Sequence, residues 1–404
     1  LRTARLFSSG HRSCRTVGGR RRRGLTPTML DAAGRELSTR LLDWFQRPVT
    51  EAPRDDVFND LALDVFRYQF DRIPALGAFW GRRGRDPGSV RHWSQIPAVP
   101  TAAFRELPLA AGDPAQAEAV FRTSGTTAEG TRRGTHYLMD LSIYHAALLP
   151  NFAARLLPDG STLPMFALVP PAAELPDSSL AHMLQVVIDH LGGPGSAHYV
   201  HAASGLDRAG LTKALRSAEL RRSPVCLLGT SFSFVHWTDH LRETGEHFDL
   251  PEGSRLMDTG GFKGRSRTVP ESELRHAYLE LMGIHPDFCI NEYGMTELCS
   301  QAYETSLEER LGGALVGPRR KKWPPWARTR AVDPDTLEPL PNGETGLLQH
   351  FDLANLGSVV AVQTEDLGVC VEDGFIVLGR AGTATPRGCS IAMDELLHAA
   401  RDRS

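Results

Sequence analysis

Short apolar runs alternate with amphipathic stretches between residues 163 and 291 of this 404-residue chain. A short run that is apolar throughout is typical of a strand that is buried on both faces. Strands that alternate with helices predict a largely parallel sheet covered by helices. The predicted strands span residues 163–169, 197–200, 225–228, 255–259 and 288–291, and the predicted helices span residues 178–191, 206–220, 231–241 and 271–282.

The segments before and after this alternation have different residue patterns. Apolar residues at helical spacing predict helices near both ends of the chain. After residue 325, turns rich in Pro, Asp and Asn separate short β-like runs, and the Asp373-Gly374 pair predicts a tight hairpin. The further predicted elements are helices over residues 29–46, 56–80 and 391–400, strands over residues 346–351 and 359–363, and a hairpin over residues 369–378.

These patterns predict an α/β fold with two structured parts. We expect a layered parallel-sheet core over residues 29–325 and a small antiparallel β subdomain over residues 326–380. Residues 381–404 are expected to form a short tail. Residues 1–28 hold eight Arg and no acid, and the first Met is Met29. We expect this leader to be disordered or mistranslated upstream sequence, and we exclude it from the fold prediction.

Composition excludes several classes of protein. The net charge is -3, so residues 29–404 carry a net charge of -11, which argues against a basic surface that binds nucleic acid. No apolar run is long enough to span a bilayer, which excludes a membrane-spanning protein. The six cysteines show neither C-x-x-C spacing nor zinc-finger spacing. Without a signal peptide, we expect reduced thiols and a cytoplasmic location.

The segment 121–134, FRTSGTTAEGTRRG, is a candidate phosphate-binding loop. Glycines allow backbone N–H groups to turn toward an anion, and hydroxyls add further donors. The Lys-Ser/Thr pair that ends a Walker loop is missing, so the loop belongs to a different nucleotide-binding design. The candidate phosphate ligands are Thr123, Ser124, Gly125, Thr126 and Thr127.

Four further segments carry groups that suit a nucleotide. Residues 258–264, DTGGFKG, follow a predicted strand with glycines that can lie flat against a base, and they include one of only four lysines. Residues 291–297, NEYGMTE, offer an aromatic face, a hydroxyl and a carboxylate. The pairs Glu365-Asp366 and Gly379-Arg380 add a carboxylate for ribose hydroxyls and a permanent positive charge.

Together and in this order, the five segments resemble the acyl-adenylate-forming superfamily. Within it, the GGFKG turn and the terminal GR…RGCSIAMDE look like the acyl-protein synthetase family of the bacterial luminescence fatty acid reductase system. The resemblance implies that residues 123–127 hold the phosphates of ATP and that Glu297 holds Mg²⁺. It further implies that Gly260, Gly261 and Tyr293 enclose adenine, that Thr296 contacts the α-phosphate, and that Asp366 and Arg380 bind the ribose.

The resemblance implies a ligase that activates a fatty acid with ATP and carries the acyl group on its own cysteine for a partner such as an acyl reductase. Typical superfamily members continue past the Gly-Arg pair with a mobile domain of about 100 residues that carries a catalytic lysine. Here 24 residues follow Arg380, so we expect neither this lysine nor a full mobile domain. We predict that Lys263 replaces the missing cation.

Cys389 is the predicted acyl acceptor. The cysteines at positions 226, 289, 299 and 370 lie in or beside apolar runs, where buried thiols are commonly inert. We expect Arg387 to favour the thiolate of Cys389. Nine residues separate Cys389 from Arg380, and an extended chain of this length reaches about 30 Å, enough to bring the sulfur to an acyl adenylate.

Two other functions stay open at this point. The first is an acyl- or aryl-CoA ligase, which would need a coenzyme A site. The second is a non-catalytic homologue that binds nucleotide or docks a partner. Each of the three functions predicts a different product from ATP, Mg²⁺ and a carboxylic acid.

Overall fold

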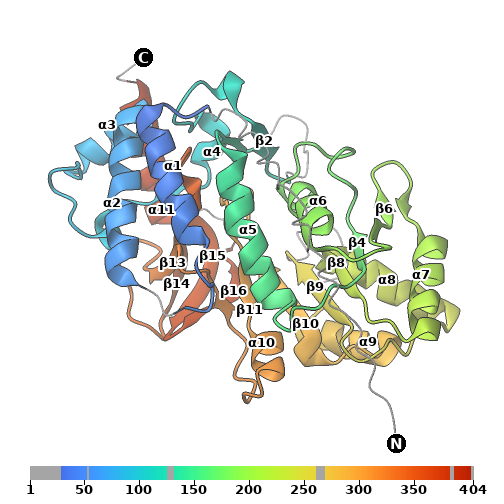
Figure 1. The fold of residues 1–404 in the computed structure, drawn as a ribbon. Coiled ribbons are helices and arrows are strands. Elements are labelled where there is room, and N and C mark those ends of the chain that lie inside the picture. The colour runs from blue at the N-terminus through green and yellow to red at the C-terminus, as the bar shows by residue number, and fades with distance from the viewer. Residues whose placement is uncertain (1–28, 52–53, 125–131, 261–268, 383–385, 402–404) are drawn as a thin grey trace, which may run out of the picture.

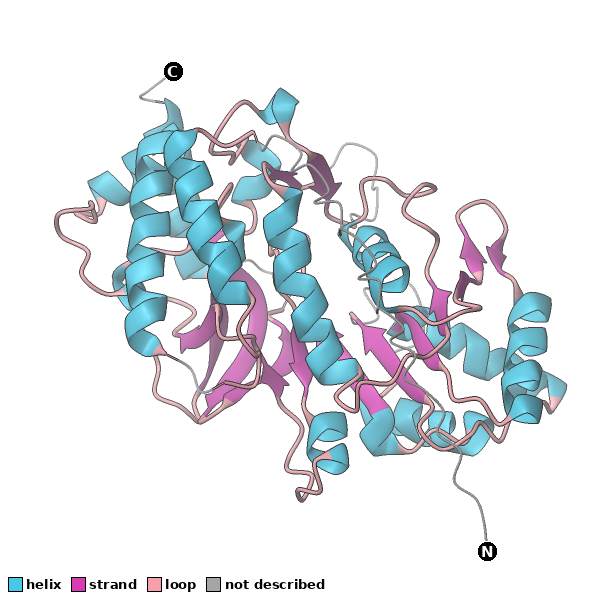
Figure 2. Cartoon of the chain, viewed as in Figure 1, coloured by secondary structure: helices cyan, strands magenta, loops and turns pink. Residues whose placement is uncertain are grey.

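A single large sheet forms the centre of the molecule in the computed structural model, which describes residues 29–51, 54–124, 132–260, 269–382 and 386–401 (Figures 1 and 2). The sheet has twelve strands. One half is parallel and the other half is antiparallel. This arrangement confirms the predicted α/β fold with a largely parallel core.

The parallel half has the strand order β5-β4-β8-β9-β10. Each connection in the order of the chain passes through a helix, as expected for parallel neighbours. The strands are β4 (Met165–Leu168), β5 (Ala197–His198), β8 (Cys226–Thr230), β9 (Arg255–Thr259) and β10 (Cys289–Tyr293), and the helices are α6 (Ser179–Leu191), α7 (Arg208–Arg221), α8 (Ser231–Thr244) and α9 (Glu271–Met282). All the elements predicted between residues 163 and 291 are therefore confirmed, with ends shifted by a few residues. A small hairpin, β6 (Val200–His201) with β7 (Gly205–Leu206), lies apart from the sheet.

The antiparallel half continues from β10 with the order β11-β12-β16-β15-β14-β13. The predicted hairpin is confirmed, because β15 and β16 pair from Val371 and Gly374 outward. The sheet is continuous across residue 326, the predicted start of a separate β subdomain, and that division stays a prediction. The strands are β11 (Ala302–Glu304), β12 (Lys321–Lys322), β13 (Ala327–Val332), β14 (Thr345–Asp352), β15 (Ala361–Val371) and β16 (Gly374–Arg380), and β1 (Val99–Pro100) pairs in parallel with β15.

Helices near the N-terminus pack beside the antiparallel half (Figure 1). The single helix predicted over residues 56–80 is wrong, because it is two helices that meet at Ile73 and Pro74. Pro74 disfavours a helical conformation at Ile73, which is extended (φ -114°, ψ 94°). The remaining helices are α1 (Ala32–Phe45), α2 (Asp55–Arg72), α3 (Pro74–Arg82), α4 (Ala103–Glu106), α5 (Leu141–Leu156), α10 (Ser306–Leu311) and α11 (Arg387–Arg401).

A second small sheet pairs β2 (Ala119–Arg122) with β3 (Thr135–Leu138). These two strands lead into and out of the candidate phosphate loop. Short 3₁₀ turns at residues 93–95, 114–116, 286–288 and 353–355 complete the secondary structure of the described residues.

Apolar side chains fill the space on both faces of the sheet. One large cluster joins α1, α2, α3, α5 and α11 to the sheet, and Phe45 of α1 packs against Trp326 with ring centroids 4.4 Å apart. A second cluster lies between the parallel strands and α7, α8 and α9. None of the helices in the described ranges is long and apolar enough to cross a membrane.

Trp80 provides a test of the packing between the N-terminal helices. Its side chain is fully buried, its indole N–H donates to the main-chain oxygen of Pro97 at 2.8 Å, and its ring lies 4.8 Å from that of Phe66. We expect Trp80→Ala to lower the free energy of unfolding by about 3–5 kcal/mol, because it removes a large buried ring and leaves a cavity. Denaturant titration followed by circular dichroism measures the loss.

Leu220→Ala is the matched control, since Leu220 is 83% exposed. Its effect should stay within about 0.5 kcal/mol. Equal effects of the two substitutions would contradict the packing described for α3.

Candidate functional site

The side chains of Tyr293 and Asp366, predicted to contact the base and the ribose of a nucleotide, lie against each other. The phenol of Tyr293, at the end of β10, donates to Asp366 Oδ2 on β15 at 2.8 Å. Arg380, the register partner of Asp366, places Nε 3.5 Å from Asp366 Oδ1. Burial and the neighbouring carboxylate raise the pKa of Tyr293 well above its usual value, so the phenol keeps its proton. Three predicted site residues therefore meet at one place.

An aromatic group surrounds the ring of Tyr293. Its ring centroid lies 5.5 Å from that of Phe375, 6.2 Å from that of Trp323 and 5.3 Å from that of His350. His350 Nε2 also lies 3.0 Å from the Tyr293 phenol oxygen. The ring of Tyr293 is therefore held in one orientation by its neighbours.

Thr296 lies beside the β2–β3 hairpin. His136 on β3 contacts the main-chain oxygen of Thr296 through Nδ1 at 2.8 Å. Burial lowers the pKa of His136 to about 4, so the neutral ring donates through Nδ1–H. The Thr296 hydroxyl lies 3.5 Å from that of Ser179 at the start of α6. The hairpin that carries Thr123 at its end is thus fixed beside the segment that carries Tyr293.

Contacts around Thr123 close the base of the candidate phosphate loop. The Thr123 N–H donates to the Gly134 oxygen at 2.9 Å, and the Gly134 N–H donates to Thr123 Oγ1 at 2.9 Å. Arg133 donates to the Thr123 oxygen at 2.6 Å and forms an ion pair with Asp177 at 2.6 Å. Since Oγ1 acts here as an acceptor, the hydroxyl hydrogen of Thr123 can still be donated to another group.

Gly260 and Glu297 lie shortly after the ends of two neighbouring parallel strands, β9 and β10. Gly260 directly follows β9 with φ +74°, a conformation that favours glycine, and its oxygen accepts a hydrogen bond from Ser231 at 2.9 Å. Glu297 is buried, and its main-chain oxygen accepts from Asn355 Nδ2 at 2.9 Å. No three His, Cys, Asp or Glu side chains gather as a metal site among the described residues. A single carboxylate fits Mg²⁺ that takes its other ligands from phosphate and water.

Five predicted site residues lie outside the described ranges, and their roles stay predictions. They are Gly125, Thr126, Thr127, Gly261 and Lys263.

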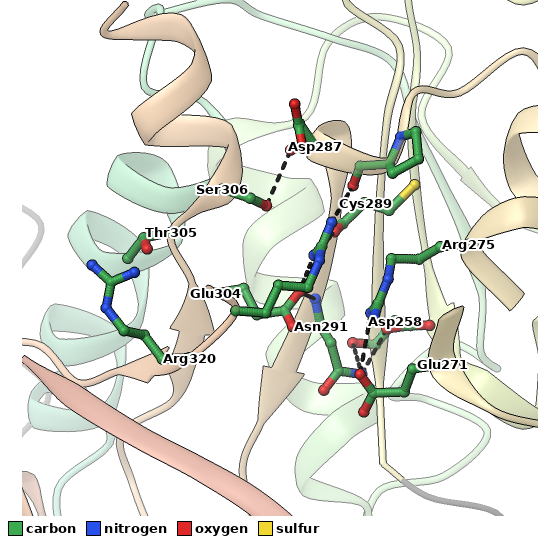
Figure 3. A network of polar contacts seen from close by, with 12 residues as sticks. Asp258, Glu271, Arg275, Asp287, Cys289, Asn291, Glu304, Thr305, Ser306 and Arg320 are labelled. Carbon is green, nitrogen blue, oxygen red and sulfur yellow. Dashed lines mark hydrogen bonds and ion pairs between the residues drawn. The ribbon is translucent and has the colours of Figure 1, made fainter. Parts of the chain in front are cut away.

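A row of buried and half-buried polar side chains crosses four adjacent strands, and part of it is visible in Figure 3. Asn291 Nδ2 donates to Asp258 Oδ1 at 2.7 Å, and the Asn291 N–H donates to Glu304 at 3.0 Å. Lys321 Nζ donates to the main-chain oxygen of Asn291 at 2.8 Å, and Arg319 binds Glu304 at 2.6 Å. These contacts tie β9, β10, β11 and β12 together through side chains as well as through the backbone.

This row supports the ends of the two central strands. Residues two apart on a strand share a face of the sheet, so Asp258 and Asn291 lie directly behind Gly260 and Tyr293. Burial alone would raise the pKa of Glu304, but Lys321 and Arg319 bring it below its usual value. The carboxylate is therefore ionised and able to hold the main chain of β10.

Cys389 lies in the first turn of α11, which begins at Arg387. The helix predicted over residues 391–400 is therefore present and begins earlier than predicted. The thiol is 3% exposed and packs in a small apolar cluster with Val332 and Leu347. The reason for the difference is that apolar residues of α11 recur at helical spacing from Cys389 onward, at Ala392, Leu396 and Ala399.

The electrostatics of Cys389 also differ from the prediction. Burial, together with the charge of Glu365, raises the pKa of the thiol to about 11. The expectation that Arg387 favours the thiolate is therefore wrong for this arrangement. The role of Cys389 as the acyl acceptor stays a prediction.

Three residues of the site were missed in the sequence. His350 interrupts an apolar strand run, His136 lies two residues after the candidate loop, and Lys321 is one of only four lysines. A polar residue inside an apolar run and a rare residue type are both usable signals. Neither indicates which partner the residue contacts.

Residues 200–398 match the family model described as acyl-protein synthetase, LuxE. Two curated relatives, each named long-chain-fatty-acid–luciferin-component ligase, are similar over 187 residues: that of Vibrio harveyi is 24% identical and that of Aliivibrio fischeri is 22% identical. Each alignment covers 44% of this chain and 47% of the relative. The chain thus spans about half the length of the curated relatives that it matches.

Solved structures of 2-hydroxyisobutyryl-CoA ligase have a similar fold. An open conformation with 2-HIB-AMP and CoA has a TM-score of 0.56 and 15% identity, covering 82% of this chain and 76% of the ligase chain. A postadenylation state with R3-HIB-AMP has a TM-score of 0.57 and 15% identity, covering 80% and 67%. At this identity the likeness shows the fold alone. Over residues 200–398 the chain is similar to the acyl-protein synthetase, LuxE, family.

Proposed function

We propose that this protein joins a carboxylic acid to AMP at the expense of ATP and then carries the acyl group as a thioester on Cys389. The observation that carries the proposal is the contact between Tyr293 and Asp366, which brings together two predicted nucleotide-binding segments 73 residues apart in the sequence. The names of the curated relatives support a long-chain fatty acid as the substrate. An acyl reductase that accepts the acyl group, and a cytoplasmic location, belong to the same proposal.

In the first step a carboxylate oxygen attacks the α-phosphorus of ATP, and the bond to pyrophosphate breaks. Negative charge spreads over the phosphate oxygens, so catalysis depends on N–H groups and cations placed around them. Residues 123–127 and Thr296 would donate to the phosphates, and Lys263 would supply a positive charge. Asp366 and Arg380 would hold the ribose, and adenine would lie between Tyr293 and residues 260–261.

Glu297 is the proposed Mg²⁺ ligand. When bound, the ion would neutralise charge on the phosphates. Glu297 is 6% exposed, so its carboxylate acts in a setting from which most water is excluded.

In the second step the sulfur of Cys389 attacks the acyl carbon, and the bond between that carbon and the phosphate oxygen breaks. AMP leaves and a thioester forms. The thiol gives up its proton in this step, and its pKa of about 11 makes that loss unfavourable in the arrangement described above. The proposal therefore requires the first turn of α11 to expose the sulfur before transfer.

Labelled carboxylic acids test the proposal directly. The protein is incubated with ATP, Mg²⁺ and a panel of radiolabelled acids that includes long-chain fatty acids. We expect label on the chain that hydroxylamine removes, and we expect Cys389→Ser to lose the label while it retains pyrophosphate exchange. Coenzyme A consumption without labelled protein would favour a CoA ligase, and no AMP with any acid would leave a non-catalytic homologue.

Two carboxylates provide a quantitative test of the first step. Glu297→Gln and Asp366→Ala should each lower ATP–pyrophosphate exchange by about two orders of magnitude, a typical loss when one charge-stabilising group is removed. Glu372→Gln, in the exposed turn between β15 and β16, is the control and should leave exchange unchanged. Full exchange in either site variant would refute the role assigned to that residue.

The raised pKa of Cys389 predicts the pH dependence of its alkylation. Below a pKa of about 11, the thiolate fraction rises with pH, so the rate of alkylation should rise about tenfold per pH unit from pH 7 to pH 10. Mass spectrometry of the peptide that contains Cys389, after timed exposure to iodoacetamide, measures this rate.

The urea-unfolded chain is the control for this measurement. Its Cys389 has an ordinary pKa near 8.5, so its rate should level off above about pH 9. A folded protein whose rate also levels off there would show that the thiol is not held as described.

A further inference from the structure

Five side chains form a continuous hydrogen-bonded series that ends on Asp366. Trp323 Nε1 donates to Thr329 Oγ1 at 2.5 Å, and Thr329 Oγ1 lies 2.7 Å from His350 Nδ1. His350 Nε2 lies 3.0 Å from the Tyr293 phenol oxygen, which lies 2.8 Å from Asp366 Oδ2. The five residues come from β13, β14, β15, the end of β10 and the segment just after β12.

The two ends of this series fix the direction of every hydrogen bond. An ionised carboxylate can only accept, so Tyr293 donates its single hydroxyl hydrogen to Asp366. The phenol oxygen can then only accept from His350, which places the ring hydrogen on Nε2. His350 Nδ1 is therefore an acceptor, and Thr329 donates to it while accepting from the donor-only indole of Trp323.

His350 is suited to a role in which its protonation state stays constant and does not change with pH. It is 1% exposed and lies among the rings of Tyr293, Trp323 and Phe375. Burial lowers its pKa to about 3, so the ring stays neutral under physiological conditions. A neutral ring with one donor and one acceptor is the only form that satisfies both of its neighbours.

We propose that His350 is a positioning residue for the nucleotide: as the Nε2–H tautomer it orients the phenol of Tyr293, which in turn fixes the carboxylate of Asp366 toward the ribose. Asp366 Oδ2 is held by Tyr293, and Oδ1, which Arg380 approaches, is left to face a ribose hydroxyl. This inference rests on the proposed function, because it assigns His350 to the same nucleotide site.

The tautomer can be measured without any assumption about activity. In protein labelled with ¹⁵N-histidine, long-range ¹H–¹⁵N spectra distinguish the two neutral tautomers and the protonated ring. The His350 signals are assigned by their absence in His350→Gln. We expect a neutral Nε2–H ring throughout the range from about pH 5 to pH 8 in which an unperturbed histidine titrates.

Two tryptophans provide a matched pair for the same spectra. Trp323→Phe removes the indole donor from the series, whereas Trp326→Phe removes a buried indole that donates to Ser300 outside it. Only the first substitution should alter the His350 signals. Identical spectra for both variants would contradict the proposed series.

Kinetics of ATP–pyrophosphate exchange test the effect on the nucleotide. His350→Phe should raise the KM for ATP about tenfold and change kcat less than about threefold. The reason is that it removes the hydrogen bond to Tyr293, which in turn holds Asp366, the proposed ribose ligand. His350→Gln, whose amide can still donate near the Nε2 position, should recover most of the loss. In a Tyr293→Phe background, His350→Phe should add less than about a twofold change, since the link to Asp366 is already broken.

The outcomes separate this inference from the proposed function. A wild-type protein with no exchange would overturn the proposed function and the nucleotide role of His350 with it. In an active protein, an unchanged KM in His350→Phe, or additive effects with Tyr293→Phe, would overturn the inference alone. An Nδ1–H or protonated His350 would overturn the hydrogen-bonded series whatever the activity.

Discussion

The hydrogen bond between Tyr293 and Asp366 constrains the shape of the whole sheet. β10 and β15 are not neighbours, because β11, β12 and β16 lie between them. In a flat sheet four strand spacings would separate the two residues by about 19 Å, far more than a phenol and a carboxylate can bridge. The antiparallel half must therefore curl back toward the end of β10. The aromatic rings of Trp323, His350 and Phe375 fill the concave side of this curl, which is where the site residues converge.

The two faces of β15 contact different groups of side chains. Asp366 points to Tyr293, whereas its neighbours Glu365 and Leu367 lie on the side of Cys389. The same strand thus separates the proposed nucleotide-binding side chains from the proposed acyl acceptor. This separation explains how a cysteine only nine residues from Arg380 can be close in the sequence and yet lie outside the group of side chains around Tyr293.

Much of the fold could be predicted from the sequence, because the apolar runs between residues 163 and 291 repeat with strand and helix periods. The prediction of one helix at Ile73 and Pro74 failed because of a single local effect. The proline ring of Pro74 ends one helix and begins the next, although the apolar spacing continues through both. Tyr293, Asp366 and Arg380, chosen from motif positions, lie in contact with one another, and their roles toward a nucleotide stay predictions. The partners of these residues could not be predicted, since contacts such as that between His350 and Tyr293 depend on the curvature of the sheet. Periodicity in the sequence carries no information about that curvature.

The position of Cys389 has a chemical consequence of its own. Oxidants and disulfides react with thiolates, and a buried thiol with a pKa of about 11 offers almost none at neutral pH. Packed between α11 and the strands beneath it, the sulfur is shielded from peroxide and from mixed disulfides for as long as the helix stays docked. Burial of the thiol and the negative charge of Glu365 thus both disfavour the reactive thiolate of this cysteine.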